Sequence, residues 1–543
     1  MLTSNFQNSG LRQKVDQLMD ILWAGGVNNP MDSIEQLSYL IFLRLLSEQD
    51  EEYAALSRKY NRVFTGEWAK YQWGNFVTLT GDQLFDAVRS AIEKLHELPG
   101  MSETGRLLFN RATLKIYDRP TLRAVIQVIN DMDLSEHEGI DLKGDMYEYL
   151  LSKLSTSGTN GQFRTPRHII DLIVTLVDPR PGETIADPAC GTAGFLVSAF
   201  NHIKRGHTSK SDLDQGRLTG DQLTSAQWRF IEDKAFTGYD NDANMVKIAI
   251  LNLYLHKLEK ANIQFHNPLT SGIGSPYPGR TFDVILANPP FAGKIQQESI
   301  LADLNLNTRS TELLFVKWFL DHLTPTGRAG LIVPNGVLFG GTNAAVKVRE
   351  LLLEHGLQAV INLPSGVFKP YSGVGTAILI LDRSSVIASE AKQSPLPGVT
   401  ASRRSSGGEA VSSSAGRLPR RDFDASASQH PPRNDTEGND TFIWFYDLTA
   451  DGYSLDDKRT EIAANDIPDL IAKWHGREEG PNSYRVPVAK ILDSEDRSLA
   501  AGRYKPVTAQ AATHDAPGDI LSEVLALEDE IIKKAKDLLM AIK

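Results

Sequence analysis

The residues with the most specific chemistry are Asn288, Pro289, Pro290 and Phe291, which follow the apolar run FDVILA. In open α/β sheets, ligands bind at the carboxyl ends of strands, where this run would place them. The prolines stiffen the turn, the Asn288 side chain and the backbone offer carbonyl acceptors, and Phe291 offers a flat apolar face. This set suits a planar ring that carries an NH₂ group. The alternative is a proline-rich turn that Asn288 caps and that binds no ligand.

A second candidate is the stretch 187–195, DPACGTAGF, which lies between a strand-like run and a helical one. Its glycines permit a tight turn and a close approach of backbone N–H groups to a ligand. The spacing is neither GxGxxG nor GxxxxGK[ST], so it does not predict a dinucleotide site or a P-loop. A turn without a ligand is the alternative. Cys190 has no indicated base beside it, so we expect a packing residue rather than a reactive thiol.

Asp240 ends the strand-like run FTGYD (236–240). An acidic side chain at this position can accept hydrogen bonds from both hydroxyls of a ribose. Asp240 or Asn241 can also cap the helix that follows, and the two roles are compatible.

The stretch QFRTPR (162–167) precedes the glycine-rich loop. Thr165 is a good helix N-cap and Pro166 a good first helical residue. These structural roles leave Phe163, Arg164 and Arg167 to line a pocket.

From about residue 161 the sequence alternates short apolar runs rich in β-branched residues with helical stretches. This alternation predicts an α/β fold with a mostly parallel sheet that helices cover on both faces. The expected strands are 184–189, 236–240, 282–290, 329–335, 359–364, 375–382 and 441–448. The expected helices are 166–177, 194–204, 242–257, 311–323 and 343–355.

Three further regions flank or interrupt this pattern. Residues 1–155 show amphipathic helical spacing and are expected to form a helical N-terminal domain before a catalytic domain at 156–480. Residues 384–440 are rich in Ser, Pro and Gly, which predicts a disordered insertion at the tip of a hairpin between the strands 375–382 and 441–448. The alternative for this insertion is a basic loop that contacts DNA.

The C-terminal region, 481–543, ends in a helical stretch at 518–543 with apolar residues at heptad spacing. Such a seam packs against another helix. We favour a helix of another subunit over one of the chain's own domain, because the stripe is terminal and long.

The chain has 543 residues, a formal net charge of −11 and one cysteine. One cysteine excludes a disulfide framework, and His168, His256 and His266 form no metal-ligand motif, so we expect no metal site. We see no signal peptide and no apolar run long enough to span a membrane, and we expect a cytoplasmic protein. The acidic balance argues against a protein that binds nucleic acid with its whole surface, although a local basic groove is compatible with it.

With DPACGTAGFL followed by NPPF, the chain resembles the S-adenosylmethionine-dependent methyltransferases that act on adenine N6 in DNA. It most closely resembles the modification subunit of type I restriction–modification systems, in which QFRTPRHIIDLIV and IWFYDLTADGYSLDDKR (443–459) also have counterparts. The resemblance implies a Rossmann-like methyltransferase sheet and a flipped adenine held by residues 288–291. Asp187 would lie near the amino-acid end of the cofactor, Asp240 at its ribose, and Asn267 near its adenine. The other implied cofactor-binding residues are Gln162, Phe163, Arg164, Thr165, Pro166, Arg167, Gly191, Thr192, Ala193 and Gly194.

The resemblance also implies the partners: duplex DNA, a specificity subunit that reads the target site, a second modification subunit and, in some complexes, a restriction subunit. No membrane partner is implied. Two other functions remain open at this point. A protein glutamine N5-methyltransferase would use a similar NPPF loop, and a non-catalytic assembly subunit could retain the fold.

Overall fold

The computed structural model describes residues 9–56, 61–99, 103–134, 141–156, 165–270, 280–370, 372–384 and 441–505, with four single positions beyond them. The predicted insertion from residue 385 onward and the heptad seam at 518–543 lie outside the described residues, as do Gln162, Phe163 and Arg164. The chain up to Ala501 forms one compact unit.

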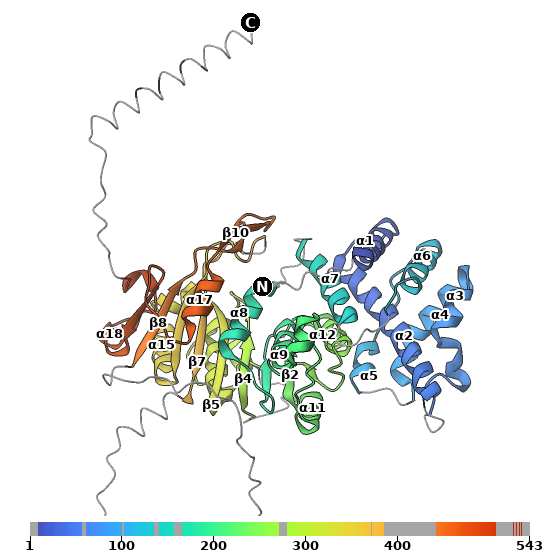
Figure 1. Ribbon diagram of the computed structural model, residues 1–543, viewed down its shortest axis with the longest axis horizontal. Coiled ribbons are helices and arrows are strands. Elements are labelled where there is room, and N and C mark those ends of the chain that lie inside the picture. The colour runs from blue at the N-terminus through green and yellow to red at the C-terminus, as the bar shows by residue number, and fades with distance from the viewer. Residues whose placement is uncertain are drawn as a thin grey trace, which may run out of the picture. The chain divides into compact units, whose positions relative to one another are not determined.

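The N-terminal part of the chain is helical, as its spacing predicts (Figure 1). Leu11, Val15, Leu18 and Leu22 recur on one face of α1 and are all buried, which is the behaviour of an amphipathic helix. Further along, α2 contacts α12 of the next region, where Lys247 Nζ donates to the Tyr39 hydroxyl at 2.9 Å. The helices of this part are α1 Ser9–Ala24, α2 Pro30–Leu56, α3 Trp73–Thr78, α4 Gly81–Lys94, α5 Glu103–Phe109, α6 Arg119–Asn130 and α7 Leu142–Thr156.

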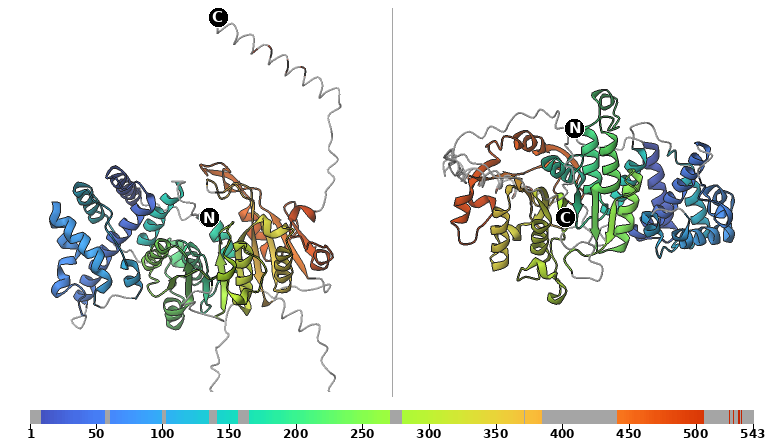
Figure 2. Two further views of the ribbon diagram at one scale, coloured as in Figure 1. Left: turned by 180° about the vertical axis from the view of Figure 1, so that it is seen from behind. Right: turned by 90° about the horizontal axis from the view of Figure 1, so that it is seen from below.

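A nine-stranded sheet follows, with strand order β11-β8-β6-β7-β5-β4-β1-β2-β3 (Figures 1 and 2). Neighbouring strands from β5 to β3 are parallel, as are β6 and β8, whereas β7 and β11 run antiparallel to their neighbours. The strands are β1 Ile185–Asp187, β2 Phe236–Asp240, β3 Asn262–Phe265, β4 Phe282–Ala287, β5 Leu323–Pro334, β6 Leu357–Asn362, β7 Thr376–Asp382, β8 Phe442–Asp447 and β11 Ser483–Pro487. A separate ribbon pairs β9 Asp451–Tyr453 with β10 Glu461–Asn465.

Helices cover both faces of this sheet. Consecutive residues of β1, β4, β5 and β6 are therefore buried whichever face their side chains point to. In one group of helices, α8 contacts α9 and α17. In another group, α15 contacts α13 and α14. The predicted α/β fold is confirmed. The helices are α8 Arg167–Val177, α9 Gly194–Gly206, α10 Lys210–Asp214, α11 Ser225–Phe230, α12 Ala243–Leu255, α13 Thr311–His322, α14 Asn335–Phe339, α15 Asn343–Glu354, α17 Ile467–Trp474 and α18 Val488–Leu492.

Two expectations about the last strands are wrong. The strands β7 and β8 do not form a hairpin, because β6 lies between them and pairs with both. The aromatic run of β8 is buried on both faces, which an interior strand satisfies better than the arm of an exposed hairpin. The expected boundary at residue 480 is also misplaced, since β11 pairs along its whole length with β8 and belongs to the main sheet.

The helix α8 lies unusually close to the sheet at Gly330 of β5. A Cβ atom at Gly330 would come within 2.4 Å of Ile173 and 2.8 Å of Val177, so only glycine permits this approach. On α9, a Cβ at Gly194 would come within 3.0 Å of Ile170, so α9 also packs closely against α8. These two glycines set the position of α8, whose first turn faces the candidate site.

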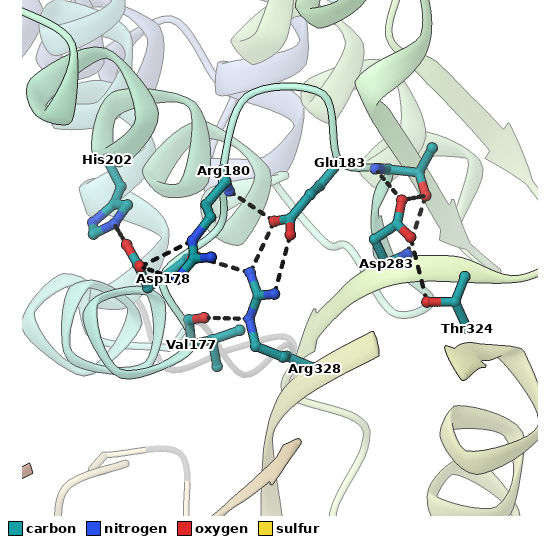
Figure 3. A network of polar contacts seen from close by, with 9 residues as sticks. Val177, Asp178, Arg180, Glu183, His202, Asp283, Thr324 and Arg328 are labelled. Atoms are coloured by element: carbon teal, nitrogen blue, oxygen red, sulfur yellow. Dashed lines mark hydrogen bonds and ion pairs between the residues drawn. The ribbon is translucent and has the colours of Figure 1, made fainter. Parts of the chain in front are cut away.

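A polar network ties the last turn of α8 to the sheet (Figure 3). The Arg328 guanidinium on β5 donates to both carboxylate oxygens of Glu183, at 3.0 and 2.8 Å, and to the carbonyls of Val177 and Asp178. Next to it, Asp283 accepts from the backbone and hydroxyl of Thr184, the residue before β1. The network therefore fixes the C-terminal end of α8 against β1, β4 and β5.

We expect Arg328→Met to lower the free energy of unfolding by about 3 kcal/mol, because it leaves the partly buried Glu183 carboxylate and two backbone carbonyls without their hydrogen-bond donor. Urea unfolding measures the change. The matched control is Lys347→Met, which breaks an exposed ion pair with Glu350 and should cost less than about 0.5 kcal/mol. Equal losses in the two variants would contradict this account of the network.

Candidate active site

A cavity of about 640 Å³ opens at the carboxyl ends of β1, β2 and β4. Its position is the one that parallel α/β sheets reserve for ligands. Three of its lining residues, Pro30, Met31 and Leu154, come from the N-terminal helices, and no motif in the sequence marks them. The predicted site residues that line it are Thr165, Asp187, Gly191, Thr192, Gly194, Asp240, Asn267, Asn288, Pro289 and Pro290.

The glycine-rich loop forms one wall of the cavity. Its Cys190 N–H donates to the Tyr239 carbonyl at 2.8 Å, and its Gly191 N–H donates to Asp240 Oδ2 at 2.9 Å. Gly191 and Ala193 both have positive φ, of 50° and 63°, and Ala193 is the N-cap of α9. The loop packs closely on β2 at Gly238, where a Cβ would come within 3.1 Å of Cys190 and 2.8 Å of Ile263.

Two carboxylates face this cavity, the buried Asp187 and the partly buried Asp240, and the hydrogen bonds that they accept come from backbone N–H groups. Asp187 accepts from Ala189 at 3.0 Å, and Asp240 accepts from Gly191 and from Asp242. Burial raises the pKa of both side chains, and in Asp187 the charge of Asp240 raises it further. Within the described residues neither forms an ion pair. The cavity is therefore a place where a positive charge on a ligand is favoured.

Cys190 lies in the same wall and is 5% exposed. Burial and the charges of Asp187 and Asp240 raise its pKa well above the ordinary value. The thiol is thus held protonated, which agrees with a packing role.

Asn288 lines the same cavity and lies directly after β4. Its Nδ2 donates to the Thr165 hydroxyl at 3.0 Å. Its Oδ1 is buried and has no hydrogen-bond partner among the described residues. Buried amide oxygens are rarely left unpaired, so this one is ready to accept a hydrogen bond from a ligand in the cavity.

Some predicted site residues are not part of the cavity lining. Phe291 is 8% exposed and packs edge-to-face on Phe368, with ring centroids 5.0 Å apart. Arg167 forms ion pairs with Glu148 of α7 and Asp171 of α8. Pro166 and Ala193 also lie outside the lining residues.

Both helix caps expected in this region differ from the structure. The helix α8 begins at Arg167 with Pro166 at its N-cap, because the Thr165 hydroxyl bonds to Asn288 rather than to the helix. The N-cap of α12 is Asp242, whose carboxylate accepts from the N–H groups of Asn244 and Met245. This leaves Asp240 to the loop and the cavity.

Two of the histidines hold the first turn of α8 and its surroundings. The His168 Nε2 lies 2.9 Å from the buried Asp451 carboxylate, which also pairs with Arg459, and the His168 ring stacks on Tyr453. The buried His256 pairs with Asp141, just before α7. The part of the chain that the structure describes contains no group of three or more residues that could hold a metal ion.

The fold and this site define an enzyme of the DNA methylase class. The model of the N-6 DNA Methylase family matches residues 138–393, and the model of the HsdM N-terminal domain matches residues 11–129. The first match spans α7 and the strands β1 to β7, and the second spans most of the helical region before them. Within the described ranges, no helix is both long and apolar enough to cross a membrane.

The relatives narrow this class. The methylase subunit of the type I restriction enzyme EcoEI of Escherichia coli is 31% identical over 382 residues, which cover 68% of this chain and 74% of that protein. The methylase subunit of the type I restriction enzyme EcoKI of Escherichia coli K12 is 28% identical, and the match covers 70% of this chain and 68% of that protein. The chain belongs to the family of type I restriction enzyme methylase subunits, and it is a DNA methyltransferase of the adenine N6 type.

Solved structures agree in fold over nearly the whole chain. A chain of a type I R-M system, solved to describe complex assembly and conformational transition, has a TM-score of 0.66 at 26% identity and covers 98% of both chains. A modification subunit of a type I restriction enzyme from Vibrio vulnificus YJ016 has a TM-score of 0.63 at 22% identity, and the match covers 89% of this chain and 92% of that chain.

Proposed function

We propose that this subunit transfers a methyl group from S-adenosylmethionine to the N6 atom of an adenine that has been flipped out of duplex DNA. The observation that carries the proposal is the buried Oδ1 of Asn288, which has no partner among the described residues, beside a cavity that Asn288, Asp187 and Asp240 all line. A base inside the duplex cannot reach such a cavity, so it must leave the stack.

The carboxylate pair fits S-adenosylmethionine, which carries positive charges on its sulfonium and its amino group. Asp240 accepts one backbone hydrogen bond on each oxygen and retains lone pairs for ribose hydroxyls. Asp187 would lie near the amino-acid end, and Asn267, whose Oδ1 accepts from Leu269, lines the cavity where the cofactor's adenine would lie. When bound, the cofactor supplies a methyl group on a good leaving group.

The chain's own contribution to the reaction is then placement and charge. The N6 lone pair of adenine is delocalised into the ring, which makes the amine a poor nucleophile. Hydrogen bonds from the NH₂ group to Asn288 Oδ1 and to the Pro289 carbonyl would favour a more tetrahedral nitrogen with its lone pair localised. Such positioning and preorganised dipoles account for the rate without a covalent enzyme intermediate.

We further propose that a specificity subunit selects the DNA site and that two methylase subunits join it. The net charge of −11 supports this division, because a chain of this balance has little general affinity for a polyanion. The stretch 518–543 remains our candidate for docking the specificity subunit. Of the two alternatives, the family match disfavours a protein glutamine N5-methyltransferase, and the intact cavity disfavours a purely assembling subunit.

We expect Asn288→Ala to lower methyl transfer to duplex DNA by at least about a hundredfold, because it removes an acceptor that acts on the reacting amine. Binding of S-adenosylmethionine should stay nearly unchanged. Transfer of a radiolabelled methyl group, measured with the complex that contains the specificity subunit, checks the rate, and calorimetry checks binding. Transfer at the wild-type rate would refute the role of Asn288.

The same assay tests the division of labour between subunits. Wild-type protein should label duplex DNA only when the specificity subunit is present. Labelling of protein instead of DNA would support the glutamine methyltransferase, and failure to bind the cofactor would support a purely assembling subunit.

The affinity for S-adenosylmethionine should rise with pH above the ordinary pKa range of a carboxyl group. Burial raises the pKa of Asp187 and Asp240, which favours the protonated form of each in the free protein, and a bound cation favours the ionised form. One coupled proton limits the rise to about tenfold per pH unit. Calorimetry in buffers of different ionisation enthalpy should show proton release, and Asp187→Asn should reduce it. Proton uptake, or no dependence on pH, would contradict the assignment.

A further inference from the structure

Thr165 and Asn288 meet across the cavity, although 123 residues separate them in the sequence. Thr165 is 8% exposed and lies two residues before α8, whereas Asn288 follows β4. The single hydrogen bond between their side chains runs from Asn288 Nδ2 to Thr165 Oγ1 and measures 3.0 Å.

This bond decides which end of the Asn288 amide faces the substrate. The oxygen and nitrogen ends of an amide have nearly the same size, so packing alone selects neither, and only a hydrogen-bond partner distinguishes them. If the amide were reversed, its NH₂ group would face the NH₂ group of adenine, donor against donor. With Nδ2 engaged by Thr165, the unpaired Oδ1 is the end that remains for the substrate.

We propose that Thr165 is a positioning residue for methyl transfer: its hydroxyl oxygen accepts from Asn288 Nδ2 and thereby holds Oδ1 toward the target amine. This inference rests on the acceptor role proposed above for Asn288. It gives Thr165 a function toward the DNA base in addition to any contact with the cofactor.

The surroundings of Thr165 hold its hydroxyl in place. The first turn of α8 is anchored on one side by the ion pair of Arg167 with Glu148 of α7. On the other side, His168 is anchored by Asp451 of β9, whose side chain is fully buried. The segment IWFYDLTADGYSLDDKR, which the catalytic chemistry leaves without a task, supplies this second anchor. An ion pair at Arg167 and a hydrogen bond at His168 thus fix the first two residues of α8, which follow Thr165 and Pro166.

The test uses Thr165→Val, which keeps the shape of the side chain and removes the acceptor. With saturating cofactor and the specificity subunit present, single-turnover transfer should slow about tenfold, as expected for one lost neutral hydrogen bond. Thr165→Ser, which restores a hydroxyl, should transfer within about twofold of wild type. The matched control is Thr175→Val on the same helix, whose hydroxyl bonds only to the Asp171 carbonyl and whose loss should leave the rate unchanged.

The same substitution in the Asn288→Asp variant distinguishes a positioning role of Thr165 from a general structural defect. In Asn288→Asp the two carboxylate oxygens are equivalent, so either orientation presents an acceptor and Thr165→Val should have little further effect on the rate. An equal slowing by Thr165→Val in both backgrounds would overturn the inference, because neighbouring residues that act together are non-additive. A Thr165→Val rate equal to wild type beside an inactive Asn288→Ala would also overturn it while leaving the proposed function intact. A wild-type rate for Asn288→Ala would overturn the proposed function itself.

Discussion

The close packing of α8 on the sheet is the constraint on which the active site depends. A glycine at position 330 lets the helix approach β5 to a distance that any side chain would prevent. The Arg328 network fixes the end of the helix, and the ion pair of Arg167 and the hydrogen bond of His168 with Asp451 fix its beginning. Because both ends are held, the residue before the first turn reaches Asn288 at the carboxyl end of β4.

The second organising factor is electrostatic. The cavity lining combines the carboxylates of Asp187 and Asp240, whose pKa values burial raises, with the neutral amide of Asn288. In the proposed reaction, a cationic cofactor would interact with the carboxylates and a neutral amine would donate to the amide oxygen. The acidic net charge of the chain is compatible with the proposal that a partner recognises the DNA.

Much of the fold and the centre of the site could be predicted from the sequence, because they depend on local signals. The strand-like runs and the two motifs at their carboxyl ends place Asp187, Asp240 and Asn288 correctly around one cavity. The errors arise where long-range packing decides. The order of β6, β7 and β8 is set by which strand must be buried on both faces, and a sequence pattern does not reveal the neighbour of a strand.

The same limit applies to individual side chains of the site. The pattern QFRTPR predicts a cap at Thr165 and a pocket-lining side chain at Arg167, but each side chain has a partner that is distant in sequence. Phe291 likewise packs on Phe368, a contact that no local motif indicates. The N-terminal residues that line the cavity could not be predicted either, because only long-range packing brings them there.

His168 and Asp451 are in contact although they are synthesised far apart in time. Every residue that faces the cavity precedes position 316, yet the buried carboxylate that secures the first turn of α8 is added more than a hundred residues later during synthesis. A nascent chain released as far as β7 contains every residue that lines the cavity but not Asp451. The contact that holds His168 can therefore form only after β9 has been synthesised.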